Sequence, residues 1–215
     1  MPDDSFSLAA ARELAVLGSG EFAWPEVWAT RGNSATVASH LRHYATVAAH
    51  LQPADSVIDV GCGCGLATRI YRLHVGGRVV AVDRPPAITV ARNYYPMPGV
   101  EYHSIEFSRN ELPEGEFDVA IMLEVLEHLQ AEVGAAVLQQ IAARLRQNGR
   151  LYFSVPLLSR GNRPASEVKH HVRDFADPDA ALAEATRYLF AGQSAHLVYM
   201  DAIAASGGGG RCAQL

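Results

Sequence analysis

Residues 57–65 read VIDVGCGCG and carry the clearest signal of the fold in this chain. A short apolar run carrying Asp59 is followed at once by glycines at positions 61, 63 and 65. Glycine tolerates positive φ and has no Cβ, so a turn of this composition can bend sharply from strand to helix and bring its backbone close to a ligand. We therefore predict a ligand over this turn.

The chain beyond the turn alternates between strand and helix patterns. Apolar strand runs follow at 78–83, 100–105, 117–123 and 150–156, with a crossover helix expected over 133–145 that stops at 147–149. The strand runs are continuously apolar, which is typical of a parallel sheet covered on both faces. We predict an α/β, Rossmann-like, doubly wound and mostly parallel seven-stranded sheet.

The two ends of the chain depart from this alternation. Residues 7–17 and 34–51 have helical character, so we predict an N-terminal helical cap over 1–50 on an α/β domain over 51–215, the two forming one structural domain. Asp177 is expected to cap a helix over 178–189. The tail, HLVYMDAI followed by SGGGG and RCAQL, predicts an antiparallel strand pair with a flexible connection and a short last strand.

Composition limits the classes of function. The chain has 215 residues, a formal net charge of −5 and an apolar content of 49%, which fits one globular domain and gives no support to tight, non-specific nucleic-acid binding. No apolar run approaches the roughly 20 residues of a membrane span, and the N-terminus lacks a signal-peptide pattern, so we expect a cytoplasmic protein without membrane association. The three cysteines are too few for a closed zinc site.

The acidic end of the second strand run adds to the glycine turn. Asp83 ends the run RVVAVD, and a carboxylate there can accept hydrogen bonds from both hydroxyls of a ribose. The third glycine comes one residue earlier than in the G-x-G-x-x-G dinucleotide pattern. These blocks resemble the class I S-adenosylmethionine-dependent methyltransferases over about residues 51–156, and the resemblance implies S-adenosylmethionine as the cofactor.

Further blocks carry the same resemblance. IEF at 105–107 stands where the family has an acidic residue near the adenine, ELPEGEFDVAIMLEVLEHL at 111–129 matches its fourth-strand block, and QNGRLYFSVP at 147–156 matches its fifth strand. The resemblance implies these cofactor-binding residues: Asp59, Gly61, Cys62, Gly63, Gly65, Asp83, Arg84, Glu106, Phe107 and Glu124.

Two histidines are the candidates for catalysis. Glu124, Glu127 and His128 form an E-x-x-E-H pattern, expected at the start of a helix, and His128 can act as general base because histidine titrates near neutral pH. His171, in the stretch HHVRDF, is the second candidate for acceptor contact or proton removal. Trp24, Trp28 and Tyr44 can either close over a bound sulfonium or pack within the cap.

We expect methyl transfer to an oxygen or nitrogen of a small-molecule metabolite, with no metal. One alternative is a metal-dependent RNA 3′-terminal 2′-O-methyltransferase, because E-x-x-E-H followed by a histidine resembles the enzymes that hold a divalent ion with two Glu and two His. Here those would be Glu124, Glu127, His128 and either His170 or His171. Another alternative is a non-catalytic S-adenosylmethionine-binding module. The short final strand leaves both a monomer and a homodimer open.

Overall fold

The computed structural model describes residues 34–199 and 202–206, whose strands form one sheet in the order β3-β2-β1-β4-β5-β6-β7. The strands are β1 (Val57–Val60), β2 (Val79–Asp83), β3 (Val100–Ser104), β4 (Phe117–Leu123), β5 (Leu145–Ser154), β6 (Ser194–Tyr199) and β7 (Ala202–Ser206). The pairs from β3 through β6 are parallel, and β7 joins β6 antiparallel. The predicted Rossmann-like, mostly parallel sheet is confirmed.

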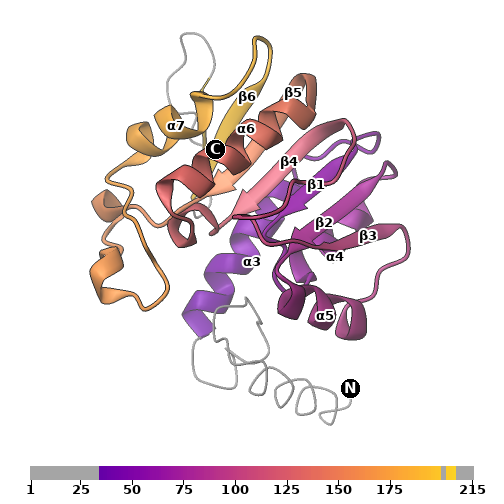
Figure 1. The fold of residues 1–215 in the computed structure, drawn as a ribbon, viewed down its shortest axis with the longest axis horizontal. Coiled ribbons are helices and arrows are strands. Elements are labelled where there is room, and N and C mark those ends of the chain that lie inside the picture. The colour runs from indigo at the N-terminus through magenta and orange to yellow at the C-terminus, as the bar shows by residue number, and fades with distance from the viewer. Residues whose placement is uncertain (1–33, 200–201, 207–215) are drawn as a thin grey trace.

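Helices cover both faces of the sheet (Figure 1). The helices are α3 (Ser34–Ala48), α4 (Leu66–His74), α5 (Pro85–Tyr94), α6 (Ala131–Arg144) and α7 (Pro178–Thr186), with short 3-10 turns η1 (Leu126–His128), η2 (Leu158–Arg160) and η3 (Ala165–Glu167). The Asp177 side chain accepts a hydrogen bond from the Ala180 amide at 2.9 Å, as its predicted capping role requires. None of the described helices combines the length and hydrophobicity that a membrane crossing demands.

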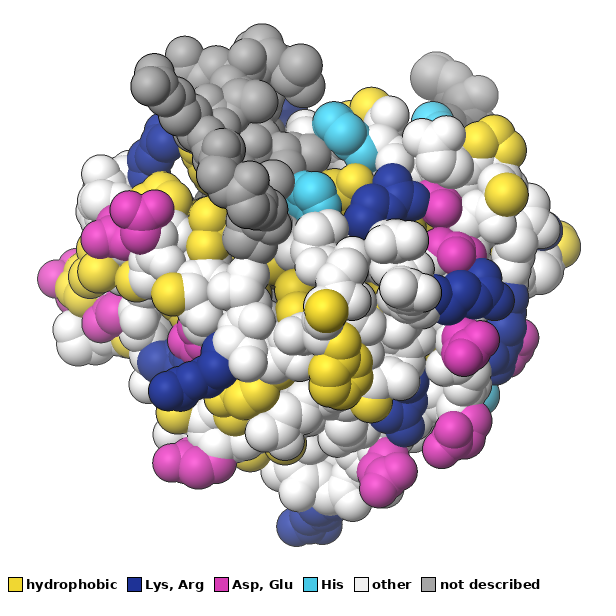
Figure 2. All heavy atoms as spheres, turned by 90° about the horizontal axis from the view of Figure 1, so that it is seen from above, with side chains coloured by type: hydrophobic (Ala, Val, Ile, Leu, Met, Phe, Trp, Pro, Cys, Tyr) yellow, Lys and Arg dark blue, Asp and Glu magenta, His cyan; other side chains and the backbone are white. Residues whose placement is uncertain are grey.

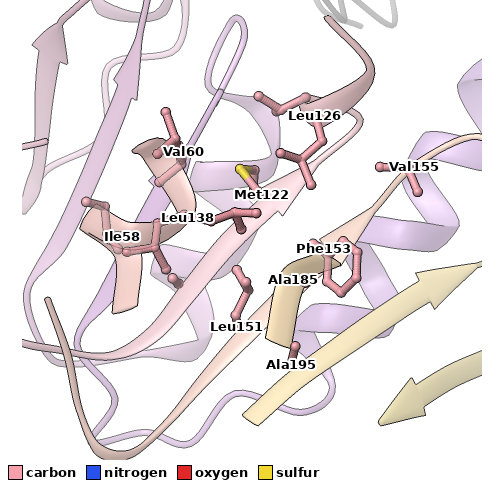
Figure 3. Close-up of a cluster of buried hydrophobic side chains, with 14 of the residues drawn as sticks. Ile58, Val60, Met122, Leu126, Leu138, Leu151, Phe153, Val155, Ala185 and Ala195 are labelled. Carbon is pink, nitrogen blue, oxygen red and sulfur yellow. The ribbon is translucent and has the colours of Figure 1, made fainter. Parts of the chain in front are cut away.

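Alternate residues of the central strands face opposite layers. Ile58 and Val60 of β1 belong to the cluster shared with α6 and α7, which also holds Phe153 (Figure 3). Val57 instead joins the cluster on the other face, which holds Tyr71 of α4. Because both faces of the sheet are buried, these strands need continuous apolar runs.

Helix α3 shares a hydrophobic core with the sheet. Tyr44, Val47 and Ala48 pack in one cluster with Tyr71 of α4 and Val198 of β6. The amphipathic helix predicted over 34–51 is therefore confirmed, with its end at residue 48. The helix predicted over 7–17, Trp24, Trp28 and the rest of the cap before residue 34 lie outside the described residues.

Two local predictions are wrong in part: the antiparallel partner of β6 and the crossover helix are both present, but the strand lies elsewhere and the helix stops earlier than expected. The strand that pairs with β6 is β7, at 202–206 and before the four glycines, whereas RCAQL lies outside the described residues. The crossover helix ends at Arg144, and β5 already includes the expected stop at 147–149. A bulge accommodates this early start, because Asn148 adopts a φ of 66° and the register between β4 and β5 shifts between Phe117 and Val119.

Candidate active site

A cavity of about 660 Å³ lies beyond the carboxyl ends of β1, β2 and β4. Strands β1 and β4 are neighbours in the sheet, and the strand order reverses between them, which is where open α/β sheets bind ligands. The cavity is lined by His40, Tyr44, Asp59, Gly61, Cys62, Gly63, Ala67, Tyr71, Asp83, Arg84, Phe107, Leu123, Glu124, Val125, Glu127, His128, Leu129, Val168, Lys169, His170, His171 and Val172.

The glycine turn after β1 forms the floor of this cavity. Gly61 and Gly63 adopt φ values of 80° and 57°, in the region that L side chains rarely occupy. A Cβ placed on Gly61 would also overlap the side chain of Val125 from the loop after β4. Glycine is therefore required at position 61 for two reasons: its backbone has a positive φ, and the loop after β4 approaches it too closely for a Cβ.

Asp83 at the end of β2 is held by backbone amides. Its Oδ2 accepts a hydrogen bond from the Gly63 amide at 2.7 Å, and its Oδ1 accepts one from the Arg84 amide at 2.6 Å. Burial raises the pKa of the carboxyl, with the two amides acting in the opposite direction. Each oxygen keeps a further lone pair, so Asp83 can still accept hydrogen bonds from a ligand.

Asp59 of β1 is buried, with 4% of its surface exposed. The Thr68 hydroxyl donates to its Oδ2 at 2.5 Å. Burial raises the pKa of Asp59 to about 7, the Thr68 hydrogen bond opposes this shift and the charge of Asp83 adds to it. The raised pKa means that Asp59 keeps its proton to a much higher pH than an exposed aspartate.

Glu124 follows β4 in a conformation unusual for a side-chain-bearing residue. Its φ is 53°, and its amide donates to the Ser154 carbonyl at 3.1 Å. The Ser154 hydroxyl donates to Glu124 Oε1 at 2.6 Å, while burial raises the pKa of the carboxyl. Backbone strain that neighbouring contacts hold in place is characteristic of functional sites.

The E-x-x-E-H stretch does not begin an α-helix, so that expectation is wrong. Residues 126–128 form the 3-10 turn η1, and α6 starts only at Ala131. Glu127 is fully buried, and among the described residues neither of its carboxylate oxygens has a hydrogen-bond partner. Burial, reinforced by the charge of Glu124, raises the pKa of Glu127 well above its ordinary value.

The polar segment after β5, residues 157–175, covers one side of the cavity. Its ends are joined by a parallel bridge between Leu157 and Phe175. Its middle is tied to η1, since the Val172 amide donates to the Glu127 carbonyl at 2.8 Å. Residues 168–172 of this segment line the cavity.

The same segment brings the two predicted catalytic histidines together. His128 Nδ1 lies 3.0 Å from the carbonyl oxygen of His170, to which it donates. The rings of His128 and His171 stand 4.9 Å apart at 82° to each other. Burial lowers the pKa of His171, and the neighbouring His128 adds to this effect. His128 and His171, which are far apart in the sequence, therefore lie side by side in the lining of the cavity.

Most of the predicted site residues line the cavity, namely Asp59, Gly61, Cys62, Gly63, Asp83, Arg84, Phe107, Glu124, His128 and His171. Two others do not. Gly65 begins α4 with a φ of 86° and packs against Ala91 and Tyr102, and the Glu106 side chain is exposed in the turn after β3.

Sequence reasoning missed several lining residues. His40 and Tyr71 reach the cavity from α3 and α4, and Lys169 from the covering segment. Tyr44, which the sequence predicts either over the ligand or within the core, is buried and also lines the cavity. No motif marks these positions, because their place depends on how the helices dock on the sheet.

Comparison with known proteins gives a consistent picture. A family model described as a methyltransferase domain matches residues 33–202. The ribosomal protein L11 methyltransferase of Burkholderia mallei (strain NCTC 10229) is 24% identical over 131 residues, which cover 57% of this chain and 39% of that protein. The chain thus spans about two fifths of the length of such relatives.

Solved structures share the fold. A Haloferax volcanii complex between the Trm112 methyltransferase activator and a methyltransferase aligns with a TM-score of 0.58 at 21% identity, covering 79% of this chain and 76% of that one. The N-methyltransferase NodS from Bradyrhizobium japonicum WM9 aligns with a TM-score of 0.53 at 19% identity, covering 69% and 80%. These alignments show that the fold is shared, and at identities below 25% they show nothing beyond the fold.

Proposed function

The chain belongs to the methyltransferase-domain family, and from this membership we propose that it transfers the methyl group of S-adenosylmethionine to an oxygen or nitrogen of a small-molecule acceptor. One observation carries the proposal. A single cavity runs from the Gly63–Asp83 contact to the His128–His171 pair. Its volume of about 660 Å³ lies within the range of small-molecule and cofactor sites.

The cofactor is assigned to the glycine-turn end of the cavity. We place the ribose hydroxyls on Asp83, whose oxygens are already oriented by two amides. Phe107 offers an apolar surface for the adenine, and Glu124 offers a carboxylate for the ammonium group of the methionine moiety. This arrangement directs the sulfonium toward His128 and His171.

The reaction needs positioning more than activation, because a sulfonium is already an activated methyl donor. The S–CH₃ bond breaks as a bond forms from the methyl carbon to the acceptor atom, and the sulfonium becomes the neutral thioether of S-adenosylhomocysteine. A hydroxyl or amine acceptor also loses a proton. We assign acceptor contact and assistance of that proton loss to His128 and His171.

The covering segment favours a small acceptor. Residues 168–172 line the cavity, so an acceptor must fit beneath them. Lys and Arg side chains are interspersed with Asp and Glu on the face shown in Figure 2, and the net charge of −5 does not favour a polyanion. The curated relatives act, by name, on a ribosomal protein, so a protein acceptor is the alternative that the experiment must test.

The proposal is tested by titration followed by transfer. The purified protein is titrated calorimetrically with S-adenosylhomocysteine and then incubated with methyl-labelled S-adenosylmethionine and, separately, a metabolite extract, ribosomal protein L11 or total RNA. We expect micromolar binding and label in the small-molecule fraction. Absence of binding overturns the cofactor assignment, and label confined to protein or RNA overturns the small acceptor. Gly61→Val serves as the transfer-deficient control.

A further inference from the structure

The carboxylate of Glu127 lacks the partners that a buried charge needs. It is fully buried and lines the cavity, and neither oxygen has a hydrogen-bond partner among the described residues. The nearby Arg173 forms an ion pair with Glu184 instead. Buried carboxylates in proteins are paired, neutralised or bound to a metal, because an isolated one is costly to desolvate.

His128 is oriented toward this carboxylate by a contact on its far side. A carbonyl oxygen can only accept, so the contact of Nδ1 with the His170 carbonyl at 3.0 Å places the proton on Nδ1. The lone pair of a neutral ring then lies on Nε2, which is 3.8 Å from Glu127 Oε1. Metal-binding histidines characteristically donate their other ring N–H to a carbonyl or carboxylate in this way.

His171 completes a set of three. One ligand atom from each of Glu127, His128 and His171 lies within 4.8 Å of the other two. Bonds of about 2.0–2.2 Å hold ligand atoms roughly 3–4 Å apart, so side-chain movements of about 1 Å close the set around an ion. We infer that Glu127, His128 and His171 form a divalent metal site at the acceptor end of the cavity, contrary to the expectation from sequence that no metal is used.

The ligand types narrow the choice of ion. Imidazole nitrogen suits Zn²⁺, Fe²⁺, Ni²⁺ or Cu²⁺ better than Mg²⁺, Ca²⁺ or Mn²⁺, which prefer oxygen ligands. Two histidines and one carboxylate also leave coordination positions open, as in metal sites that bind a substrate. The covering segment builds the site, since it supplies His171 and the carbonyl that orients His128.

The metal site specifies the acceptor, and this part of the inference rests on the proposed methyl transfer. A cation bound to a hydroxyl oxygen lowers the pKa of that hydroxyl, so its proton passes to solvent before the O–CH₃ bond forms and the S–CH₃ bond breaks. The histidines then assist proton loss through the cation. The acceptor is accordingly a hydroxyl compound.

The test is titration of the chelator-treated, tag-free protein with Ni²⁺ and with Zn²⁺, in the presence of saturating S-adenosylhomocysteine. We expect binding of one ion per chain. Glu127→Gln keeps the shape of the side chain and removes its charge, and His171→Ala removes one nitrogen; each should weaken binding at least about tenfold. Glu132→Gln and His74→Ala, both at exposed positions outside the cavity, should bind metal as the wild type does.

A parallel S-adenosylhomocysteine titration of every variant without metal separates the two proposals. Unchanged cofactor affinity in Glu127→Gln and His171→Ala shows that loss of metal binding is not loss of fold. A wild-type protein that binds S-adenosylhomocysteine but neither ion overturns the metal site and leaves the proposed function standing. Equal metal affinity in Glu127→Gln, His171→Ala and wild type overturns the ligand assignment.

Discussion

The amide of Gly63 donates a hydrogen bond to the carboxylate of Asp83 at 2.7 Å, joining the turn after β1 to the end of β2. The same carboxylate accepts from the Arg84 amide at 2.6 Å. Asp83 therefore has two tasks, since it fixes the shape of the glycine turn and presents its remaining lone pairs to the cavity.

Replacing Asp83 with Asn should weaken cofactor binding. The variant keeps one acceptor oxygen but loses the charge and places an amide N–H₂ against a backbone amide. Since a hydrogen bond to a charged group is worth about 1.5–3 kcal/mol, we expect S-adenosylhomocysteine to bind about tenfold more weakly or worse. Calorimetric titration measures this. An unchanged dissociation constant would remove Asp83 from the ribose site, and Asp179→Asn, far along the chain in α7, is the control.

The two constraints on Gly61 can be separated by a double substitution. Gly61→Ala should reduce the free energy of unfolding because the residue has a φ of 80° and its new Cβ meets Val125. Adding Val125→Ala removes the overlap and leaves the backbone strain. We expect the pair to be less destabilising than the sum of the singles, with about 1 kcal/mol or more remaining for the strained φ. If urea unfolding shows that the losses of unfolding free energy in the two single variants simply add, the overlap between the new Cβ and Val125 is contradicted.

The burial of Asp59 should make stability fall as pH rises. Its pKa is about 7 in the folded chain, against about 3.9 in an unfolded one, so between these values the folded state binds more protons. Unfolding free energy then decreases from about pH 4 to about pH 7 and levels off above, with a contribution on the order of a few kcal/mol.

Asp59→Asn removes this titration. We expect the stability advantage of wild type over Asp59→Asn to shrink between pH 5 and pH 8, as measured by urea unfolding without cofactor. A residual slope should persist in the variant, because burial also raises the pKa of Asp83. A constant difference across this range would show that Asp59 does not titrate there.

An ion pair outside the cavity should contribute to the free energy of unfolding but not to cofactor binding. Arg150 Nη2 lies 2.6 Å from Asp55 Oδ2, with side-chain exposures of 23% and 9%, and Nη1 donates to the His50 carbonyl at 3.0 Å. Breaking a largely buried pair leaves one charge unpaired, so Arg150→Met should cost about 2–4 kcal/mol of unfolding free energy. Arg150→Met with Asp55→Asn should cost less than the two single losses together. S-adenosylhomocysteine affinity should not change, and a weakened affinity would mean that the pair also shapes the site.

Much of the fold follows from local sequence. The run VIDV, the glycines after it and Asp83 predicted a strand, a sharp turn and a carboxylate at the end of the next strand, all of which the structure contains. These features depend on intrinsic preferences, because positive φ selects glycine and a sheet covered on both faces selects continuous apolar strands. The N-cap of α7 at Asp177 is predictable for the same reason.

Other features depend on docking between distant segments. The sequence does not locate the partner strand of β6, because a short apolar tail carries little register information. It also does not distinguish the 3-10 turn η1 from the start of an α-helix, because the residues of η1 are compatible with either structure. The lining contributed by α3, at His40 and Tyr44, has no local signature.

The glycine turn, the parallel strands and the acidic residue at the end of β2 can be predicted from the sequence alone, because neighbouring residues encode each of these features locally. Two features depend on the assembled fold: Glu127 is buried with no hydrogen-bond partner among the described residues, and the His128 and His171 rings stand 4.9 Å apart. That arrangement requires segment 157–175 to fold back onto η1, held by the Val172–Glu127 and His128–His170 hydrogen bonds. Such long-range contacts form only when the whole sheet and its covering segment are assembled.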